Sequence, residues 1–128
     1  MTIELPDGAT IDYLTPVEDG APCVMRGTLP PGGVVPPHSH ADPETFYVID
    51  GEADRGTGDR WTRLGAGDIA HIPPDERHAW RTAAGAVMLI VSTAKMGRFF
   101  REIAASPDDF LAIADRYGYV TDPAPAHP

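Results

Sequence analysis

The sequence predicts an all-β fold, a sandwich or barrel of short strands, that ends in one or two short α-helices. Short runs of β-forming apolar residues are separated by turn signals roughly every 8 to 12 residues, which is typical of this fold class. Glycine and proline supply 13 and 14 of the 128 residues, and the prolines lie mostly between the apolar runs. Helix signals appear instead near the C-terminus. A chain of this length forms one domain with one core.

The first half of the chain should contain four extended regions. Residues 2–14 give two short pieces around a Pro-Asp-Gly turn, and residues 23–29 form the next strand. Residues 34–40 are extended, but their prolines deny them a central place in a sheet. Residues 44–50 form the strongest strand, because a Phe-Tyr-Val-Ile run favours β-structure. We expect Gly51 to end this strand.

The second half should continue with a hairpin and three short strands. Residues 52–64 form the hairpin, with its turn around residues 56–59. The strands follow at residues 69–72, 78–82 and 86–93, each bounded by glycine or proline turns. The regular spacing of these segments favours a closed or sandwiched sheet.

The C-terminal region changes to helix signals. Ser106 is expected to cap a helix, Pro107 to take its first position and Gly118 to end it. Residues 96–105 form a shorter helix with an apolar side. Residues 119–128 form a tail, and we expect its proline-rich part, residues 121–128, to fray.

Charge and composition exclude several classes of partner. The formal net charge is −9, so the chain repels phosphate backbones and anionic membrane surfaces, and neither nucleic acid nor membrane is expected as a partner. Cys23 is the single cysteine, so no intrachain disulfide can form. No basic-then-apolar leader opens the chain, and no apolar run reaches the ~20 residues that span a bilayer. A cytoplasmic protein is the expectation.

Three histidines and a glutamate carry the strongest functional signal. They lie in G-x5-H-S-H-x3-E-x6-G, from Gly32 to Gly51, and in G-x5-P-x4-H, which ends at a later histidine. Alternation along a strand points the two histidines of the first motif the same way. Such ligands suit a divalent transition metal, with Fe, Ni, Mn, Cu and Zn all open. The four candidate ligands are His38, His40, Glu44 and His78.

Both motifs resemble those of the cupin family, over residues 23–93. The resemblance implies a jelly-roll β-barrel with one metal ion per chain near its centre, held by the four candidate ligands. It also implies a single cupin domain, residues 1–128, with helices at 96–118. Two positions depart from the family pattern: Asp75 replaces the usual glycine, and Thr82 replaces a frequent asparagine.

Five further residues are candidates for the pocket around the metal. Phe46 and Trp80 share strand faces with the ligands, so they either pack in the core or form an aromatic wall for a flat substrate. Thr82 lies on the same face as Trp80. His71 is either a polar partner of the site or an ordinary polar residue. Arg26 could clamp a substrate carboxylate if it points inward, and is a surface residue otherwise.

Apolar residues on both faces of some strands indicate a further contact surface. Tyr47 and Ile49 project opposite to Glu44, and residues 87–91 are apolar on both faces. Such strands need cover on both sides, from the C-terminal helices or from a second subunit. We expect a homodimer, in keeping with how small cupins commonly assemble.

Three functions are compatible with this reading. The first is a metal-dependent dioxygenase that acts on a small organic substrate, aromatic or enolic, with O2 as co-substrate and Glu44 as proton acceptor. A weak likeness of residues 98–102 and of the following helix to quercetinase-like bacterial cupins supports it. The alternatives are an isomerase or lyase that uses the metal as a Lewis acid, and a non-catalytic ligand-binding cupin. The fold alone cannot separate them.

Overall fold

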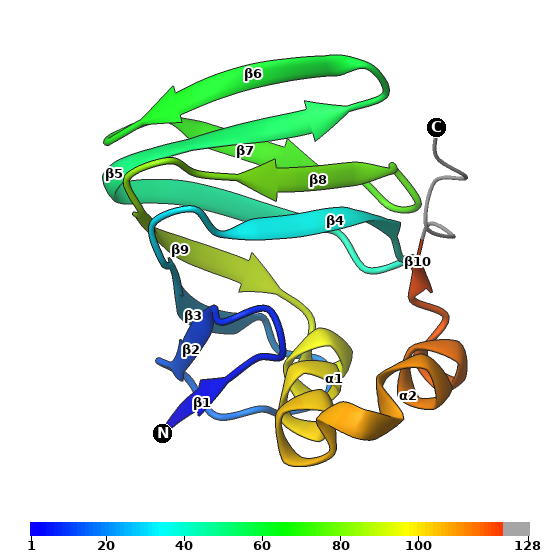
Figure 1. The fold of residues 1–128 in the computed structure, drawn as a ribbon. Coiled ribbons are helices and arrows are strands. Elements are labelled where there is room, and N and C mark those ends of the chain that lie inside the picture. The colour runs from blue at the N-terminus through cyan, green and yellow to red at the C-terminus, as the bar shows by residue number, and fades with distance from the viewer. Residues whose placement is uncertain (122–128) are drawn as a thin grey trace.

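The computed structural model describes residues 1–121 and forms a curled antiparallel β-barrel with two helices at one end (Figure 1). Every strand pairing is antiparallel. One layer runs β1-β2-β3-β9-β5-β7, and the other contains β6, β5, β8, β4 and β10. The strands are β1 (Thr2–Glu4), β2 (Thr10–Tyr13), β3 (Cys23–Leu29), β4 (Val34–Ser39), β5 (Glu44–Thr57), β6 (Arg60–Gly65), β7 (Ile69–Ile72), β8 (His78–Arg81), β9 (Ala86–Ser92) and β10 (Val120–Thr121).

Strand β5 joins the two layers, which corrects one prediction. Gly51 does not end the strand, because the chain continues extended to Thr57. The strand instead shifts register against β9 between Val48 and Asp50, and Gly51 takes a φ of 79°. A Cβ at Gly51 would lie 2.2 Å from the carbonyl oxygen of Gly85, so a side chain cannot be accommodated. The glycine therefore bends a continuous strand from one layer into the other.

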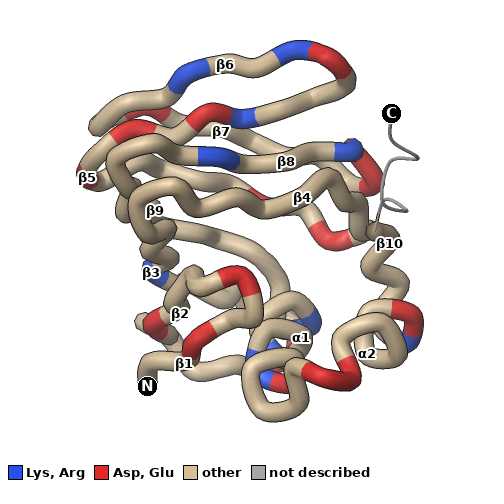
Figure 2. The backbone as a smooth tube through the Cα atoms, in the orientation of Figure 1, with Lys and Arg blue, Asp and Glu red and all other residues tan. Residues whose placement is uncertain are grey.

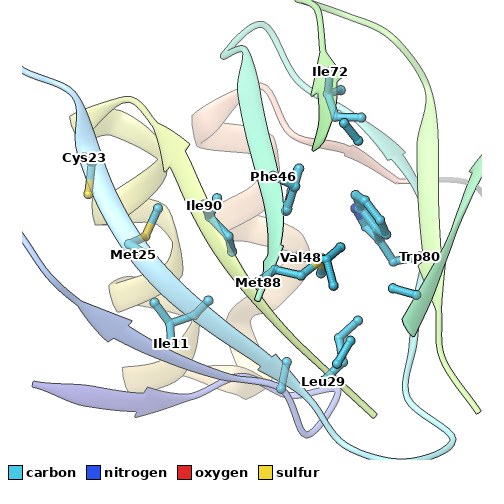
Figure 3. Close-up of a cluster of buried hydrophobic side chains, with 14 residues drawn as sticks. Ile11, Cys23, Met25, Leu29, Phe46, Val48, Ile72, Trp80, Met88 and Ile90 are labelled. Carbon is cyan, nitrogen blue, oxygen red and sulfur yellow. The ribbon is translucent and has the colours of Figure 1, made fainter. Parts of the chain in front are cut away.

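The barrel core fills with side chains from both layers (Figure 3). Burial alternates strictly along β3 and β9, so each strand turns every second residue inward. Met25, Val48 and Ile72 are completely buried. The outward residues of β9 are half-buried, so the outer face of this strand is less completely covered than its inner face.

The two C-terminal helices are α1 (Ala94–Ala105) and α2 (Phe110–Tyr117), linked by the 3-10 turn η1 (Pro107–Asp109). Thr93 caps α1, since its hydroxyl accepts the N–H of Met96 at 3.1 Å, so this helix begins two residues earlier than expected and is the longer one. Ser106 makes no side-chain cap, and Pro107 opens the 3-10 turn instead of the helix. The prediction that Gly118 ends α2 is confirmed, with φ at 71°.

At this end of the barrel, α1 lies beside β1 and β3, and α2 lies beside α1 and β10 (Figure 1). The backbone of α1 comes close to β3 at Gly97, because glycine has no side chain. A Cβ at this position would lie 2.8 Å from the Sγ of Cys23. The hydroxyl of Tyr13 donates to the carbonyl oxygen of Gly97 at 2.6 Å. A second buried cluster, centred on Phe99, fills the space between the two helices. No helix within residues 1–121 is both long and apolar enough to cross a membrane.

The start of the predicted tail is ordered against the barrel, which is a second correction. Val120 and Thr121 form β10 and pair with Ser39 and His38 of β4. The prediction of a frayed tail at residues 122–128 lies outside the described residues.

The turn before β8 provides a stability prediction. Asp75 has a φ of 64°, the one positive φ at a non-glycine position among residues 1–121, and its N–H donates to the carbonyl oxygen of His40 at 2.8 Å. A left-handed conformation costs an L-residue roughly 1–2 kcal/mol, while glycine adopts it freely at some entropic cost. Asp75→Gly should therefore raise the free energy of unfolding by up to about 1 kcal/mol in urea titrations.

Asp59→Gly serves as the control for this substitution. Asp59 also lies in a turn but has no positive φ. Glycine there relieves no strain and should lower stability slightly. A loss of stability in Asp75→Gly as large as in the control would show that Asp75 is not strained.

Candidate metal centre

Four polar side chains from three strand ends meet inside the barrel. His38 lies near the end of β4, and His40 follows that strand directly. Glu44 opens β5 and His78 opens β8, opposite His38 in register. The ligand atoms of the three histidines lie within 4.8 Å of one another. The Oε1 of Glu44 lies 3.1 Å from the Nε2 of His40 and 3.6 Å from the Nε2 of His78. Each of the four residues is at most 5% exposed.

Backbone carbonyls fix which ring nitrogen of each histidine faces the centre. The Nδ1 atoms of His38, His40 and His78 lie 2.8, 2.7 and 2.9 Å from the carbonyl oxygens of Pro36, Asp42 and Glu76. Since a carbonyl can only accept, each Nδ1 carries the proton and donates it. In the neutral rings the Nε2 atoms then present lone pairs, which is how metal-binding histidines are commonly held.

The arrangement leaves the centre without a hydrogen-bond donor unless a ring gains a proton. The Nε2 atoms of His40 and His78 are buried and have no hydrogen-bond partner, and they face a carboxylate. Buried lone pairs and a buried anion are costly without a compensating positive charge. Imidazole nitrogens and one carboxylate are suitable ligands for divalent Fe, Ni, Mn, Cu or Zn. The donor set therefore fits one metal ion.

Burial and mutual contact set the protonation of these groups. Burial, with the nearby His78, lowers the pKa of His38 to about 3, so its ring is neutral and ready to bind a cation. Burial alone would lower the pKa of His40, but contact with Glu44 outweighs it and raises that pKa. Burial would likewise raise the pKa of Glu44, but contact with His40 and His78 holds it at about 2. Without a cation, a proton on His40 neutralises Glu44.

This coupling predicts how the metal-free protein responds to acid. Glu44 has a folded-state pKa of about 2 against an ordinary value of 4.5, so its stabilising contribution is present above pH 4.5 and is lost as pH falls towards 2. After treatment with a chelator, the urea midpoint of the wild type should fall steeply in this window, and that of Glu44→Gln should fall less. Equal slopes in both proteins would contradict the ionised, paired state of Glu44.

Neighbouring side chains hold the loops that carry the ligands. The hydroxyl of Thr93 donates to Asp42 at 2.8 Å, and that of Ser92 donates to the carbonyl oxygen of Pro43 at 3.0 Å. The start of α1 thus fixes the loop between His40 and Glu44. On the other side, Arg55 forms an ion pair with Glu76, whose carbonyl oxygen orients His78.

Tyr119 is a site residue that the sequence analysis missed. Its ring stacks on His38 at 4.7 Å between centroids and 12° between planes, and on His40 at 5.6 Å and 23°. On its other side it stacks on Phe99 at 4.5 Å. One signal could have indicated this role: Tyr119 follows Gly118, which ends α2, and its N–H donates back to Ala114. A residue in this position commonly packs against its helix.

A cavity of about 210 Å³ adjoins the four polar residues. Phe46 and Trp80 line it, with their rings 4.7 Å apart, together with His38, Glu44 and His78. The C-terminal helices close its outer side. Their side chains in the wall are Met96, Phe99, Phe100, Ile103 and Phe110. The helices therefore form a cover over the open end of the barrel.

Three of the proposed pocket residues lie elsewhere. Arg26 is exposed on the outer face of β3, where its Nη2 pairs with the Oδ2 of Asp12 at 3.1 Å. His71 is also exposed, because β7 turns its two neighbours inward, and its Nδ1 shares a hydrogen bond with Thr45 at 3.1 Å.

Thr82, the third, is buried but has a structural role. Its hydroxyl donates to the carbonyl oxygen of Glu52 at 2.6 Å and accepts the N–H of Gly85 at 2.9 Å. The hydrogen bond from Gly85 closes the turn between β8 and β9, and the hydrogen bond to Glu52 attaches this turn to β5. The departure from the family pattern at this position therefore lies in the wall of the barrel, outside the cavity lining.

Comparison with known proteins agrees with this architecture. Among solved structures, the chain is similar to the polyketide cyclase RemF from Streptomyces resistomycificus, at 25% identity and a TM-score of 0.65 over 73% of each chain. An RmlC-like cupin from Shewanella frigidimarina matches at 18% identity and a TM-score of 0.66, over 73% of this chain and 83% of the other. A predicted oxalate decarboxylase from Thermotoga maritima matches at 23% and 0.62, over 73% and 90%.

The sequence itself also identifies the family. No curated protein matches the chain. The model of the cupin domain family matches residues 25–93, more than half of the chain, and this span contains all four candidate ligands. The protein therefore belongs to the cupin family.

Proposed function

We propose that this cupin is a metal-dependent dioxygenase that acts on a small organic molecule. The observation that carries the proposal is the convergence of three oriented imidazoles and one carboxylate beside an apolar cavity, which His38, Glu44 and His78 line. His38, His40, Glu44 and His78 would hold one divalent transition metal ion. When bound, such an ion supplies Lewis acidity and, if it is redox-active, electron transfer to O2.

The surrounding residues have separate tasks in this proposal. Glu44, the one carboxylate among the four ligands, would accept a proton from the substrate. Phe46 and Trp80 hold the organic body of the substrate against the site. Tyr119 and the aromatic residues of α1 and α2 keep water away from it. An apolar, covered cavity also suits O2, which carries no charge or dipole.

A Lewis-acid isomerase or lyase is the second candidate. It is favoured by the similarity at 25% identity to a protein described as a polyketide cyclase, and by a match at 28% identity and a TM-score of 0.53 to the DMSP lyase DddQ from Ruegeria pomeroyi. That second match covers 57% of this chain and 38% of the other protein. Neither name describes an oxygenase.

Oxygen uptake separates these functions. Purified protein, with its metal identified, is incubated with catechols, flavonols and diketones in an oxygen electrode, and Glu44→Gln serves as the impaired comparison. Stoichiometric O2 consumption with product formation supports the dioxygenase. Turnover that persists under anaerobic conditions excludes it and favours the Lewis-acid reaction. Tight binding of a compound without any turnover would instead indicate a binding cupin.

The proposal also includes a homodimer. Tyr47 and Ile49 are 41% and 45% exposed, and Ile69, which pairs with Tyr47 across the sheet, is 64% exposed. Apolar side chains gathered on an outer sheet face are commonly covered by a partner. Sedimentation should give twice the 13.7 kDa chain mass for the wild type and the monomer mass for Tyr47→Lys. A monomeric wild type would overturn this part.

A further inference from the structure

We infer that the substrate has a hydrocarbon body about as large as one substituted six-membered ring, with one oxygen at the metal end and no second charged group. The inference rests on the function proposed above, because it assigns a substrate class to that site. It follows from the charges of the residues that line the cavity, from the volume of the cavity and from the segments of the chain that form its walls.

Away from the metal centre, the described lining of the cavity offers no cationic side chain, and its one further carboxylate, that of Asp7, lies at the exposed edge. None of the described residues that line it is a lysine or an arginine, and its acidic residues are Glu44 at the centre and Asp7 at the edge. The strand β4 beside it carries no charged residue (Figure 2). A distal carboxylate would be buried without a counter-charge, which is strongly unfavourable. A distal ammonium group would meet aromatic and aliphatic carbon.

One oxygen at the centre is compatible with the same walls. A divalent ion beside Glu44 leaves a net charge of about +1, which one deprotonated hydroxyl or enol oxygen would neutralise. The polar end of the molecule is therefore satisfied at the metal centre, and the rest of the molecule carries no charge.

The volume of the cavity limits the size of that apolar part. A dry cavity on the order of 150 Å³ lined by aliphatic and aromatic residues accommodates benzene. At about 210 Å³, this cavity accommodates one ring with a small substituent. A second ring exceeds this volume, and towards the helices it would meet Phe99, which is completely buried.

The walls that impose this limit lie outside the matched cupin segment. Residues 25–93 provide the metal centre, Phe46 and Trp80, whereas α1, α2 and the N-terminal strands close the other side. Substrate choice is thus set largely by the flanking segments. Phe110, which lines the cavity, and Leu111, which is 72% exposed, provide a matched pair of neighbouring positions for a test.

Binding of phenols of equal size tests the charge argument. The probes are 4-isopropylphenol, 4-hydroxybenzoate and tyramine, which share a hydroxyl group and about ten non-hydrogen atoms and differ in the charge at the far end. Calorimetric titration is performed on the protein as purified and again after chelation. We expect 4-isopropylphenol to bind at least about tenfold more tightly than either charged probe in both preparations. Equal or tighter binding of a charged probe would overturn the inference.

Size and location are tested with the same assay. The two-ring 4-cumylphenol should bind at least about tenfold more weakly than 4-isopropylphenol, and equal affinity would contradict the size limit. Phe110→Trp, which fills the cavity, should weaken binding of 4-isopropylphenol, whereas Leu111→Trp should leave it unchanged. Equal affinities of both variants and the wild type would place the binding elsewhere.

These outcomes are independent of the oxygenase proposal. If the charge and size preferences hold but no O2 is consumed, the dioxygenase fails and the substrate class stands. If O2 is consumed with charged or two-ring substrates, the function stands and the substrate class is wrong.

Discussion

Replacing His78 with alanine should lower the metal content from close to one ion per chain to near zero. The ring supplies one of three oriented Nε2 atoms, and its loss leaves a buried gap beside Glu44. Loss of even an outer partner of a metal ligand commonly costs about 10- to 100-fold in affinity, so loss of a ligand should cost at least as much. Elemental analysis of extensively dialysed protein measures the effect.

His71→Ala is the matched control for this variant. It also removes one imidazole, but from the exposed face of β7, where the ring contacts Thr45. Its metal content should equal that of the wild type. If His78→Ala retains full metal, or if both variants lose it equally, the metal lies elsewhere.

Replacing Phe99 with alanine should have the largest effect on stability. The ring is completely buried, stacks on Tyr119 at 4.5 Å and contacts the aromatic residues of both helices. Truncation of a buried phenylalanine costs about 3–5 kcal/mol, from lost burial and from the cavity that remains. Urea denaturation followed by circular dichroism measures the change in the free energy of unfolding.

Leu111→Ala provides the comparison, because this side chain on α2 is 72% exposed and its loss should change stability by less than about 0.5 kcal/mol. Phe99→Ala should also keep its metal at low denaturant, since all four ligands come from the barrel. A cost below about 1 kcal/mol would show that the helices do not depend on this ring for their attachment.

Most of the fold could be predicted from the sequence because the local patterns of apolar and turn residues agree with the strands and turns of the barrel. Alternating apolar residues gave the strands, and glycine and proline marked the turns. Gly51 is the instructive exception, since a glycine after a strong strand is equally compatible with a strand end and with a bulge. The choice depends on the approach of Gly85 from a distant part of the chain, which no local pattern reveals.

The candidate site likewise contains residues that the sequence could identify and residues that it could not. His38, His40, Glu44 and His78 could be found because their spacing is specific, and the structure brings them together. Arg26 was a weaker candidate, since strand alternation alone did not decide which face turns inward, and Asp12 holds it outside. The position of Tyr119 after Gly118 indicates that it packs, but not against which residues, because its contact with His38 depends on β10 pairing with β4.

The departure at Asp75 places a strained residue where the family usually has glycine. The residue adopts the left-handed conformation that glycine would take, and its N–H still holds the carbonyl oxygen of His40. The turn therefore forms with local strain at Asp75, and the sequence keeps the motif spacing from Pro73 to His78.

X-ray absorption spectroscopy at the K edge of the bound metal tests the central claim most directly, since it gives both the identity and the ligands of the ion. The structure predicts three imidazole nitrogens and at least one carboxylate oxygen at about 2.0–2.2 Å. A ligand shell with fewer than two imidazoles, or one that contains the sulfur of Cys23, would contradict the assignment of His38, His40, Glu44 and His78 as the metal centre.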